Sequence, residues 1–120
     1  MATKLILVTS EVKYLRISPR KLRLIANAIK ELEPVEVLAR LNVWNNKASR
    51  LLTKAIKAVL ADAENNFGLE KNTLEFVEIL ANEGPRLKRI DHFHGARFQQ
   101  GLRRKRMSHL KITVKGEKKK

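Results

Sequence analysis

The amino-acid sequence predicts a single α+β domain: three helices packed on a small three-stranded antiparallel sheet, with a long extended β-hairpin. Two observations predict this fold class. Three apolar patterns of helical period follow one another between residues 18 and 66, with strand-like alternation on either side. Basic charge is concentrated after them: from Gly84 to Lys120 there are thirteen Lys and Arg against two acids, a net of +11, whereas residues 1–83 have a net of +3.

The first strand and the first helix meet at Ser18. Residues 11–17 interleave β-branched and aromatic residues with charges, which predicts a strand after a less ordered lead-in. The Ser18 hydroxyl is suited to cap exposed N–H groups, and Pro19 loses no hydrogen bond at the first helical position. We therefore expect a helix from here to about Leu32. Its buried stripe consists of Leu22, Ile25, Ala26 and Ile29.

Two further helices follow in the sequence. A short helix is expected to start at Pro34 and to end near Asn42. The next helix runs from Lys47 to about Asn66, where an Asn-Asn-Phe-Gly sequence accepts left-handed geometry. Its apolar stripe consists of Ala48, Leu51, Leu52, Ala55, Ile56, Val59, Leu60 and Ala63. Trp44, between these helices, is either a core or hinge aromatic or a platform for a nucleobase.

The remaining residues predict the sheet and the hairpin. A strand is expected over residues 74–81, and Gly84-Pro85 bends or bulges the chain without ending the ribbon. Residues 86–90 continue outward and residues 103–114 return, so the arms project roughly 25 to 35 Å. The expected parts are a globular body of about 10–85 plus 107–115, a protruding hairpin of about 86–106, and a flexible basic tail, 116–120, which is either solvated or in contact with phosphate.

Composition restricts the functional class. A net charge of +14 and a pI near 10.6 indicate a polyanionic partner, most often nucleic acid, because each neutralised phosphate releases a counterion. The alternative is a basic surface that serves solubility alone. The absence of cysteine excludes disulfides and thiolate sites. Because no apolar run reaches the roughly twenty residues of a membrane span, and Leu5–Val8 is too short for a signal-peptide core, we expect a cytosolic protein with no membrane partner.

Cations crowd the start of the first predicted helix. Arg20, Lys21 and Arg23 lie in or beside its first turn, where each exposed positive charge opposes the macrodipole at a cost of roughly 0.3 to 1 kcal/mol. Phosphate at the same helix end would make this arrangement favourable, because N–H groups and basic side chains would converge on one anion. The alternative is a solvated basic turn whose long side chains cover apolar surface.

The tip of the hairpin offers two chemistries. Asp91, His92 and His94 suggest a metal site, and hence a metal hydrolase, although the only other histidine is His109 and a competent site needs further ligands. Stacking on unpaired RNA bases is favoured by the planar side chains of His92, Phe93, His94, Arg97 and Phe98. Alternatively, the two phenylalanines close the tip as a hydrophobic cluster.

No catalytic arrangement is visible in the sequence. There is no nucleophile elbow, no phosphate-binding glycine loop, and no histidine with a local triad signature. The adjacent Ser108 and His109 point to opposite faces if they lie in a strand, so they do not form a catalytic pair. We therefore expect neither enzymatic activity nor a cofactor.

Four stretches of the sequence read as signature blocks: residues 14–24 (YLRISPRKLRL), 61–69 (ADAENNFGL), 83–89 (EGPRLKR) and 105–110 (KRMSHL). They closely resemble the blocks of the large-subunit ribosomal protein L22 family. They occur in the family's order and near its spacing, and the compact length is similar to that of bacterial members. The resemblance implies an early assembly protein with an α+β body on the outside of the large subunit, bound to 23S-type ribosomal RNA. It also implies a hairpin that runs inward to line the polypeptide exit tunnel.

The resemblance further implies site residues and partners. The expected rRNA-binding residues are Arg16, Arg20, Lys21, Arg23, Arg86, Lys88, Arg89, Arg97, Arg103, Arg104, Lys105, Arg106, Ser108 and His109. The expected tip at the tunnel consists of His92, Phe93, His94, Gly95, Ala96, Arg97 and Phe98. Expected partners are 23S-type rRNA, neighbouring large-subunit proteins and the nascent polypeptide, without a homo-oligomer.

The tip departs from the family's pattern. The family usually has Pro-Arg-Ala followed closely by Gly-Arg-Ala, whereas residues 91–98 read DHFHGARF and residues 99–101 lengthen the loop by a residue or two. The return arm reads Arg-Lys-Arg-Met before Ser108, in place of the usual Lys-Arg-Thr. The implied contacts therefore transfer to the arms but not directly to the tip. The alternative function is a free RNA chaperone or an architectural nucleic-acid-binding protein that places the ribbon in a groove.

Overall fold

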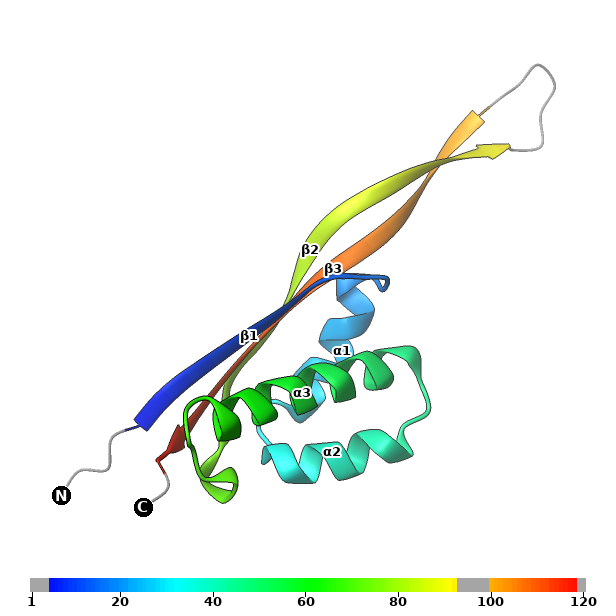
Figure 1. The fold of residues 1–120 in the computed structure, drawn as a ribbon. Coiled ribbons are helices and arrows are strands. Elements are labelled where there is room, and N and C mark those ends of the chain that lie inside the picture. The colour runs from blue at the N-terminus through cyan, green and yellow to red at the C-terminus, as the bar shows by residue number, and fades with distance from the viewer. Residues whose placement is uncertain (1–4, 93–99, 119–120) are drawn as a thin grey trace.

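The computed structural model describes residues 5–92 and 100–118 and confirms the predicted fold class. In chain order the elements are β1 (Leu5–Leu15), α1 (Pro19–Ile29), α2 (Pro34–Val43), α3 (Lys47–Asn65), a 3-10 helix (Lys71–Thr73), β2 (Glu75–His92) and β3 (Gln100–Glu117). Figure 1 shows the three helices on one side of the sheet, while β2 and β3 continue past them as a twisted two-stranded ribbon. The molecule measures 74 × 26 × 20 Å along its principal axes.

The sheet has the strand order β1-β3-β2, and β3 is antiparallel to both neighbours. β1 starts at Leu5, before the predicted residue 11, because this part of the chain pairs with the end of β3, where Leu5 lies opposite Glu117. Val8 then lies opposite Val114, and both side chains are buried under the helices. A pairing between residues more than a hundred positions apart leaves no local signal in the sequence.

The structure also differs from the predicted flexible tail at 116–120. Gly116 and Glu117 belong to β3, and Lys118 forms a bridge with Leu69. A Cβ on Gly116 would lie 2.6 Å from the Leu74 Cδ2, so glycine here lets β3 pass close to the segment that follows α3. Residues 116–118 are therefore paired with the body.

Capping residues fix the start of α1. The Ser18 Oγ accepts a hydrogen bond from the Lys21 N–H at 3.4 Å, as predicted. The helix ends at Ile29, earlier than the predicted Leu32, because the Leu32 N–H bonds to the Ile29 carbonyl and tightens the last turn. Pro34 then begins α2 after a short connection.

The longest helix, α3, is bounded as the sequence indicates. The Asn46 Oδ1 accepts a hydrogen bond from the Ser49 N–H at 2.9 Å at its start. Gly68 has a φ of 64° beyond its end, and the Leu69 N–H bonds to the Ala63 carbonyl. Between these ends, the predicted stripe faces the sheet and the other helices.

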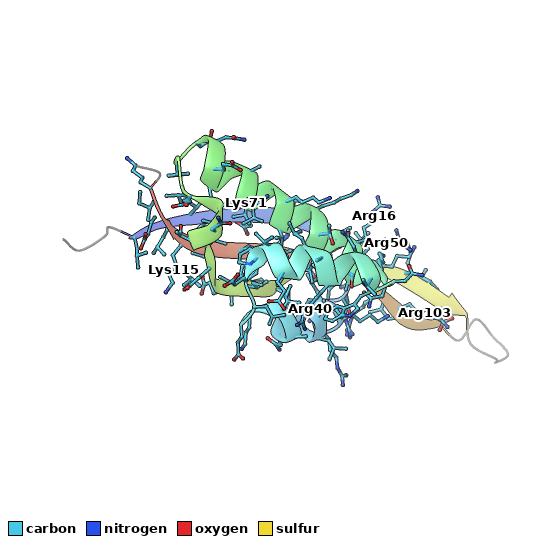
Figure 2. The ribbon with its side chains drawn as sticks, turned by 90° about the horizontal axis from the view of Figure 1, so that it is seen from below. Arg16, Arg40, Arg50, Lys71, Arg103 and Lys115 are labelled. Carbon is cyan, nitrogen blue, oxygen red and sulfur yellow. The ribbon has the colours of Figure 1, made fainter. Side chains whose placement is uncertain are left out.

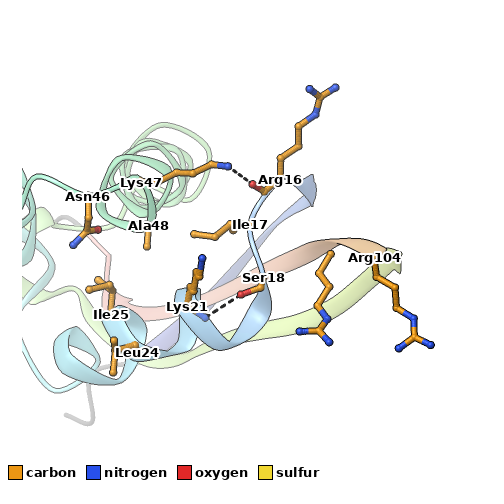
Figure 3. A pocket seen from close by; sticks show the side chains of 11 residues that line it. Arg16, Ile17, Ser18, Lys21, Leu24, Ile25, Asn46, Lys47, Ala48 and Arg104 are labelled. Carbon is orange, nitrogen blue, oxygen red and sulfur yellow. Dashed lines mark hydrogen bonds between the residues drawn. The ribbon is translucent and has the colours of Figure 1, made fainter. Parts of the chain in front are cut away.

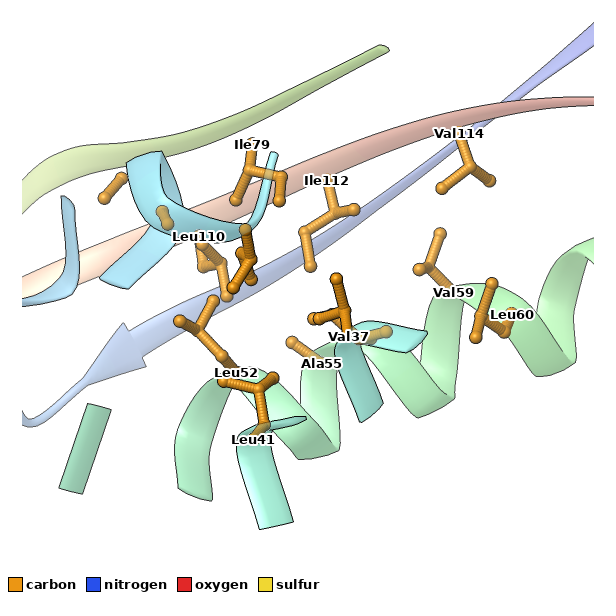
Figure 4. Packing of buried hydrophobic residues seen from close by; sticks show 14 of the residues in the cluster. Val37, Leu41, Leu52, Ala55, Val59, Leu60, Ile79, Leu110, Ile112 and Val114 are labelled. Carbon is orange, nitrogen blue, oxygen red and sulfur yellow. The ribbon is translucent and has the colours of Figure 1, made fainter. Parts of the chain in front are cut away.

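The hydrophobic core fills the space between the helices and one face of the sheet. Figure 4 shows Ile79, Leu110, Ile112 and Val114 on the strands facing Val37, Leu41, Leu52, Ala55, Val59 and Leu60 on the helices, and all of these are buried. Trp44 is half-buried and packs against the edge of this core, which agrees with its interpretation as a core or hinge aromatic. The core ends where the ribbon begins, since the described side chains of residues 86–90 and 102–106 are all exposed.

Two irregularities in strand pairing lie where the ribbon joins the body, a region that we call the root of the ribbon. The pairing of β2 with β3 shifts between Glu83 and Arg86, at the predicted Gly84-Pro85 bulge. β1 shifts between Val12 and Leu15, where Tyr14 has a φ of 61°. The Tyr14 N–H donates to the His109 Nδ1 at 3.1 Å, and the two rings meet edge to face with centroids 5.0 Å apart. These contacts hold the end of β1 against β3.

Ser108 is the buried polar connection at this root. Its side chain is fully buried, and its Oγ donates to the Ile17 carbonyl at 2.6 Å. We expect Ser108→Ala to lower the free energy of unfolding by about 1 to 3 kcal/mol, because the carbonyl would remain buried without its donor. Chemical denaturation measures this loss. Ser10→Ala, at a half-buried position of β1, is the matched control and should stay within about 0.5 kcal/mol of wild type; equal values for the two variants would contradict the assignment.

Candidate nucleic-acid interface

The ribbon places like charges directly opposite one another. Across β2 and β3, Arg86 lies opposite Arg106, Lys88 opposite Arg104, and Arg89 opposite Arg103. Like charges at directly paired positions destabilise a sheet. All six side chains are exposed, and no apolar layer covers them. Repulsion between these paired cations therefore destabilises the ribbon in the free protein. This indicates an anionic partner whose binding would offset the repulsion.

The cations occupy both faces of the ribbon. Because side chains alternate along a strand, one face carries four cations, Arg86, Lys88, Arg104 and Arg106. The opposite face carries three, Arg89, Arg103 and Lys105, together with Asp91. A protein that docks a flat surface on a duplex needs charge on one side only. Cations on both faces fit a partner that surrounds the ribbon.

Two of these arginines already have carboxylate neighbours. The Arg103 Nε lies 2.7 Å from the Asp91 Oδ2, and the Arg86 Nη2 lies 3.2 Å from the Glu83 Oε2. The Arg103 side chain is 74% exposed and that of Arg86 is 43% exposed, so solvent screens both pairs, and each arginine keeps donors for another acceptor. Lys88, Arg89, Arg104, Lys105 and Arg106 are exposed as well.

A basic depression lies at the root of the ribbon. It has a volume of about 560 Å³. It lies between the β1–α1 connection, the starts of α1 and α3, and the part of β3 where the ribbon joins the body. Figure 3 shows Lys21 and Lys47 on the two helices near Arg16, with Arg104 on the ribbon to one side of them. The Lys47 Nζ donates to the Arg16 carbonyl, which ties α3 to the end of β1. The cationic residues that line the depression are Arg16, Lys21, Lys47, Arg104 and Arg106.

The helix termini add to the positive potential of this depression. Both α1 and α3 begin beside it, and neither has an acidic residue in its first turn. α2, which begins elsewhere, has Glu36 in its first turn. The partial positive charge of two helix N-termini therefore lies near five cationic side chains and is not neutralised locally.

The predicted residues of the first basic block have different places. Arg16 and Lys21 line the depression, and Arg20 is exposed beside it on α1. The Arg23 Nε instead donates to the Ala81 carbonyl at 3.0 Å, which joins α1 to β2. Figure 2 shows Arg16 and Arg50 at the end of the body from which the ribbon emerges, with Arg103 farther out. The fold thus continues the basic surface of the ribbon onto the body.

Ser108 and His109 take part in the fold. The Ser108 hydroxyl is bound to the Ile17 carbonyl, and the His109 Nδ1 accepts from the Tyr14 N–H. For Ser108, contact with RNA would require the hydroxyl to leave its buried partner, so we assign it to positioning the ribbon. His109 is half-buried, and RNA contact through its ring remains a prediction.

The predicted tip lies mostly outside the described residues. Phe93, His94, Gly95, Ala96, Arg97 and Phe98 fall there, and the backbone of His92 ends β2. Within residues 5–92 and 100–118, no group of three or more His, Asp or Glu side chains is placed to hold a metal ion. None of the described helices is long and apolar enough to cross a membrane.

Several residues that line the depression were not predicted from the sequence as site residues. Lys47 and Leu24 line the depression, although neither belongs to the predicted set. Lys47 is in the first turn of α3, where a positive charge opposes the helix macrodipole just as it does at the start of α1. For Leu24 the signal in the sequence is an apolar residue that lies outside the buried stripe of the helix. In the structure 73% of its surface is exposed. The proximity of α1 and α3 to Arg104 and Arg106 is a property of the fold alone.

In this fold, helices cover one face of a sheet, and two of its strands extend into a ribbon with cations on both faces. These features define a class of basic proteins suited to being surrounded by a polyanion. Comparison with known proteins gives the particular family. The family model described as ribosomal protein L22p/L17e matches residues 10–115, so the chain belongs to this family.

Three similar proteins carry the name large ribosomal subunit protein uL22. The protein of Petrotoga mobilis is 46% identical over 104 residues, covering 86% of this chain and 68% of the relative. That of Thermotoga sp. is 41% identical, covering 89% and 66%. That of Thermoanaerobacter sp. is 40% identical, covering 86% and 91%. The match thus spans about two thirds of the first two relatives and most of the third.

Proposed function

We propose that this protein is a structural component of the large ribosomal subunit that binds 23S-type ribosomal RNA and supports subunit assembly. Its ribbon then contributes to the wall of the polypeptide exit tunnel. The protein acts in the cytoplasmic ribosome, beside neighbouring large-subunit proteins and the nascent chain, and performs no catalytic step. Family membership supports the ribosomal assignment.

The observation that carries the proposal is the register of the ribbon. Three like-charge pairs face each other across β2 and β3, and cations occupy both faces. RNA surrounding the ribbon would place phosphates near both faces and turn this repulsion into attraction, with counterion release as the driving force. We propose that Arg16, Arg20, Lys21, Lys88, Arg89 and Arg103 to Arg106 make most of these contacts. The remaining donors of Arg23 and Arg86 add to them.

Sedimentation of a cell lysate tests this function against a free chaperone or an architectural nucleic-acid-binding protein. The proposal requires the chain to sediment with large subunits in a stoichiometric amount and to remain with them in moderate salt. Sedimentation mainly near the top of the gradient, or with small RNAs or DNA, would contradict it. Tagging at the end of β3, far from the ribbon, avoids blocking the interface (Figure 1).

A further inference from the structure

We infer that the depression at the root of the ribbon binds one unstacked nucleotide of an RNA strand, with its base on an apolar floor and its phosphate among the surrounding cations. This inference rests on the proposed function and adds to it a site and a ligand class. Phosphate attraction along the ribbon needs no pocket, whereas this depression combines charge, volume and exposed apolar surface in one place.

The chemistry of the lining has two parts. Five of the lining residues are cationic and none is acidic, so the walls suit an anion. The apolar lining residues are Ile17, Leu24, Ile25 and Ala48, which we call the floor. Figure 3 shows Ala48, Ile25 and Leu24 together, below Lys47 and to one side of Lys21. A ligand that satisfies both parts must be anionic and must also carry an apolar, preferably flat, group.

Leu24 is the most exposed of the apolar residues that line the depression. Its side chain is 73% exposed on α1, although the neighbouring Leu22 is completely buried and supplies that turn's contact with the core. Leucine at such a position adds nothing to the core. A base lying on it would remove its surface from water.

The volume and the geometry favour a nucleotide. At about 560 Å³ the depression is within the roughly 300 to 1,000 Å³ typical of small-molecule sites. A perfect RNA duplex presents phosphates but keeps its bases stacked inside, so it would leave the floor uncovered. A bulged or looped nucleotide presents both groups at once. Arg104 and Arg106 belong to the ribbon as well, so a strand that follows the ribbon reaches the depression without a gap.

The test compares two short RNA duplexes that differ only by one bulged uridine, each titrated with the full chain at physiological salt. We expect the bulged duplex to bind about fivefold to tenfold more tightly, toward the low end of what one stacked base contributes. Leu24→Ser should abolish this preference, so that the two duplexes bind with equal affinity. Val43→Ser, which alters a similarly exposed apolar side chain on α2, is the matched control and should retain it.

A positional readout accompanies the affinities. The methyl resonances of Leu24, Ile25 and Ala48 should shift when the bulged duplex is added, and much less with the perfect one. Equal affinity of wild type for both duplexes, or a preference that survives in Leu24→Ser, would overturn the nucleotide site while the proposed function stands. Binding of neither duplex would contradict the proposed function itself. Binding of a glutamate homopolymer with the same dependence on Leu24 would assign the depression to acidic peptides and overturn the inference.

Discussion

Replacing Arg103, Arg104, Lys105 and Arg106 together with alanine is expected to weaken binding to 23S-type RNA by about a hundredfold to a thousandfold at physiological salt. The four side chains are exposed and lie on both faces of the ribbon. If each neutralises one phosphate, the slope of log affinity against log salt should become shallower by about 3 to 4. Filter binding or fluorescence titration across a series of salt concentrations measures both quantities.

A second signature separates function from stability in this variant. Arg106, Arg104 and Arg103 each lie opposite another cation, so their removal relieves repulsion in the free protein. Among the described residues, the one ion pair that is lost joins Asp91 to the largely exposed Arg103 side chain. We therefore expect the melting temperature to remain the same or to rise. The control removes the same charge elsewhere, by replacing the exposed Lys30, Lys54, Lys57 and Lys71 with alanine. If this control flattens the salt dependence as strongly, net charge and not the ribbon governs binding.

Most of the fold is predictable because its determinants are local. Ser18 and Asn46 cap helices, Gly68 takes the left-handed geometry that ends α3, and the helical stripes identify the core. The Gly84-Pro85 bulge could likewise be expected from residue type alone. By contrast, the start of β1 and the pairing of residues 116–118 depend on contacts between the two ends of the chain, which no local pattern encodes.

The candidate interface is predictable in composition but not in arrangement. The sequence identifies the cations of the ribbon, yet their cross-strand register decides that like charges oppose each other and that both faces are basic. The depression joins Arg16 and Lys21 to Arg104, which lies more than eighty positions away, so only the fold brings them together. Ser108 shows the reverse case. Its place in a signature block resembles that of an RNA-binding residue, while its burial and its bond to Ile17 show what it does in the fold.

Amide hydrogen exchange on the free protein should divide β2 and β3 into two parts of very different stability. Within β3, the amides of residues 110–114 lie in the middle of the sheet under the helices and should exchange only on global unfolding. Residues 101–106 belong to the same strand, but the ribbon there has two strands, no core and opposed cations. A two-stranded ribbon alone is marginally stable in water. We expect its amides to exchange at least about a thousandfold faster, with the change near Ser108.

The comparison within one continuous strand provides its own control, since both parts share solvent, pH and temperature. Residues 86–91 of β2 should follow residues 101–106, and residues 79–81 should follow the body, because each is paired with the corresponding part of β3. Adding 23S-type RNA should slow exchange along the ribbon while leaving residues 110–114 almost unchanged, since phosphates on both faces would remove the repulsion between paired cations. Strong, uniform protection along the whole of β3 without RNA would show that the ribbon is stable by itself. The opposed cations would then no longer explain why it needs a partner.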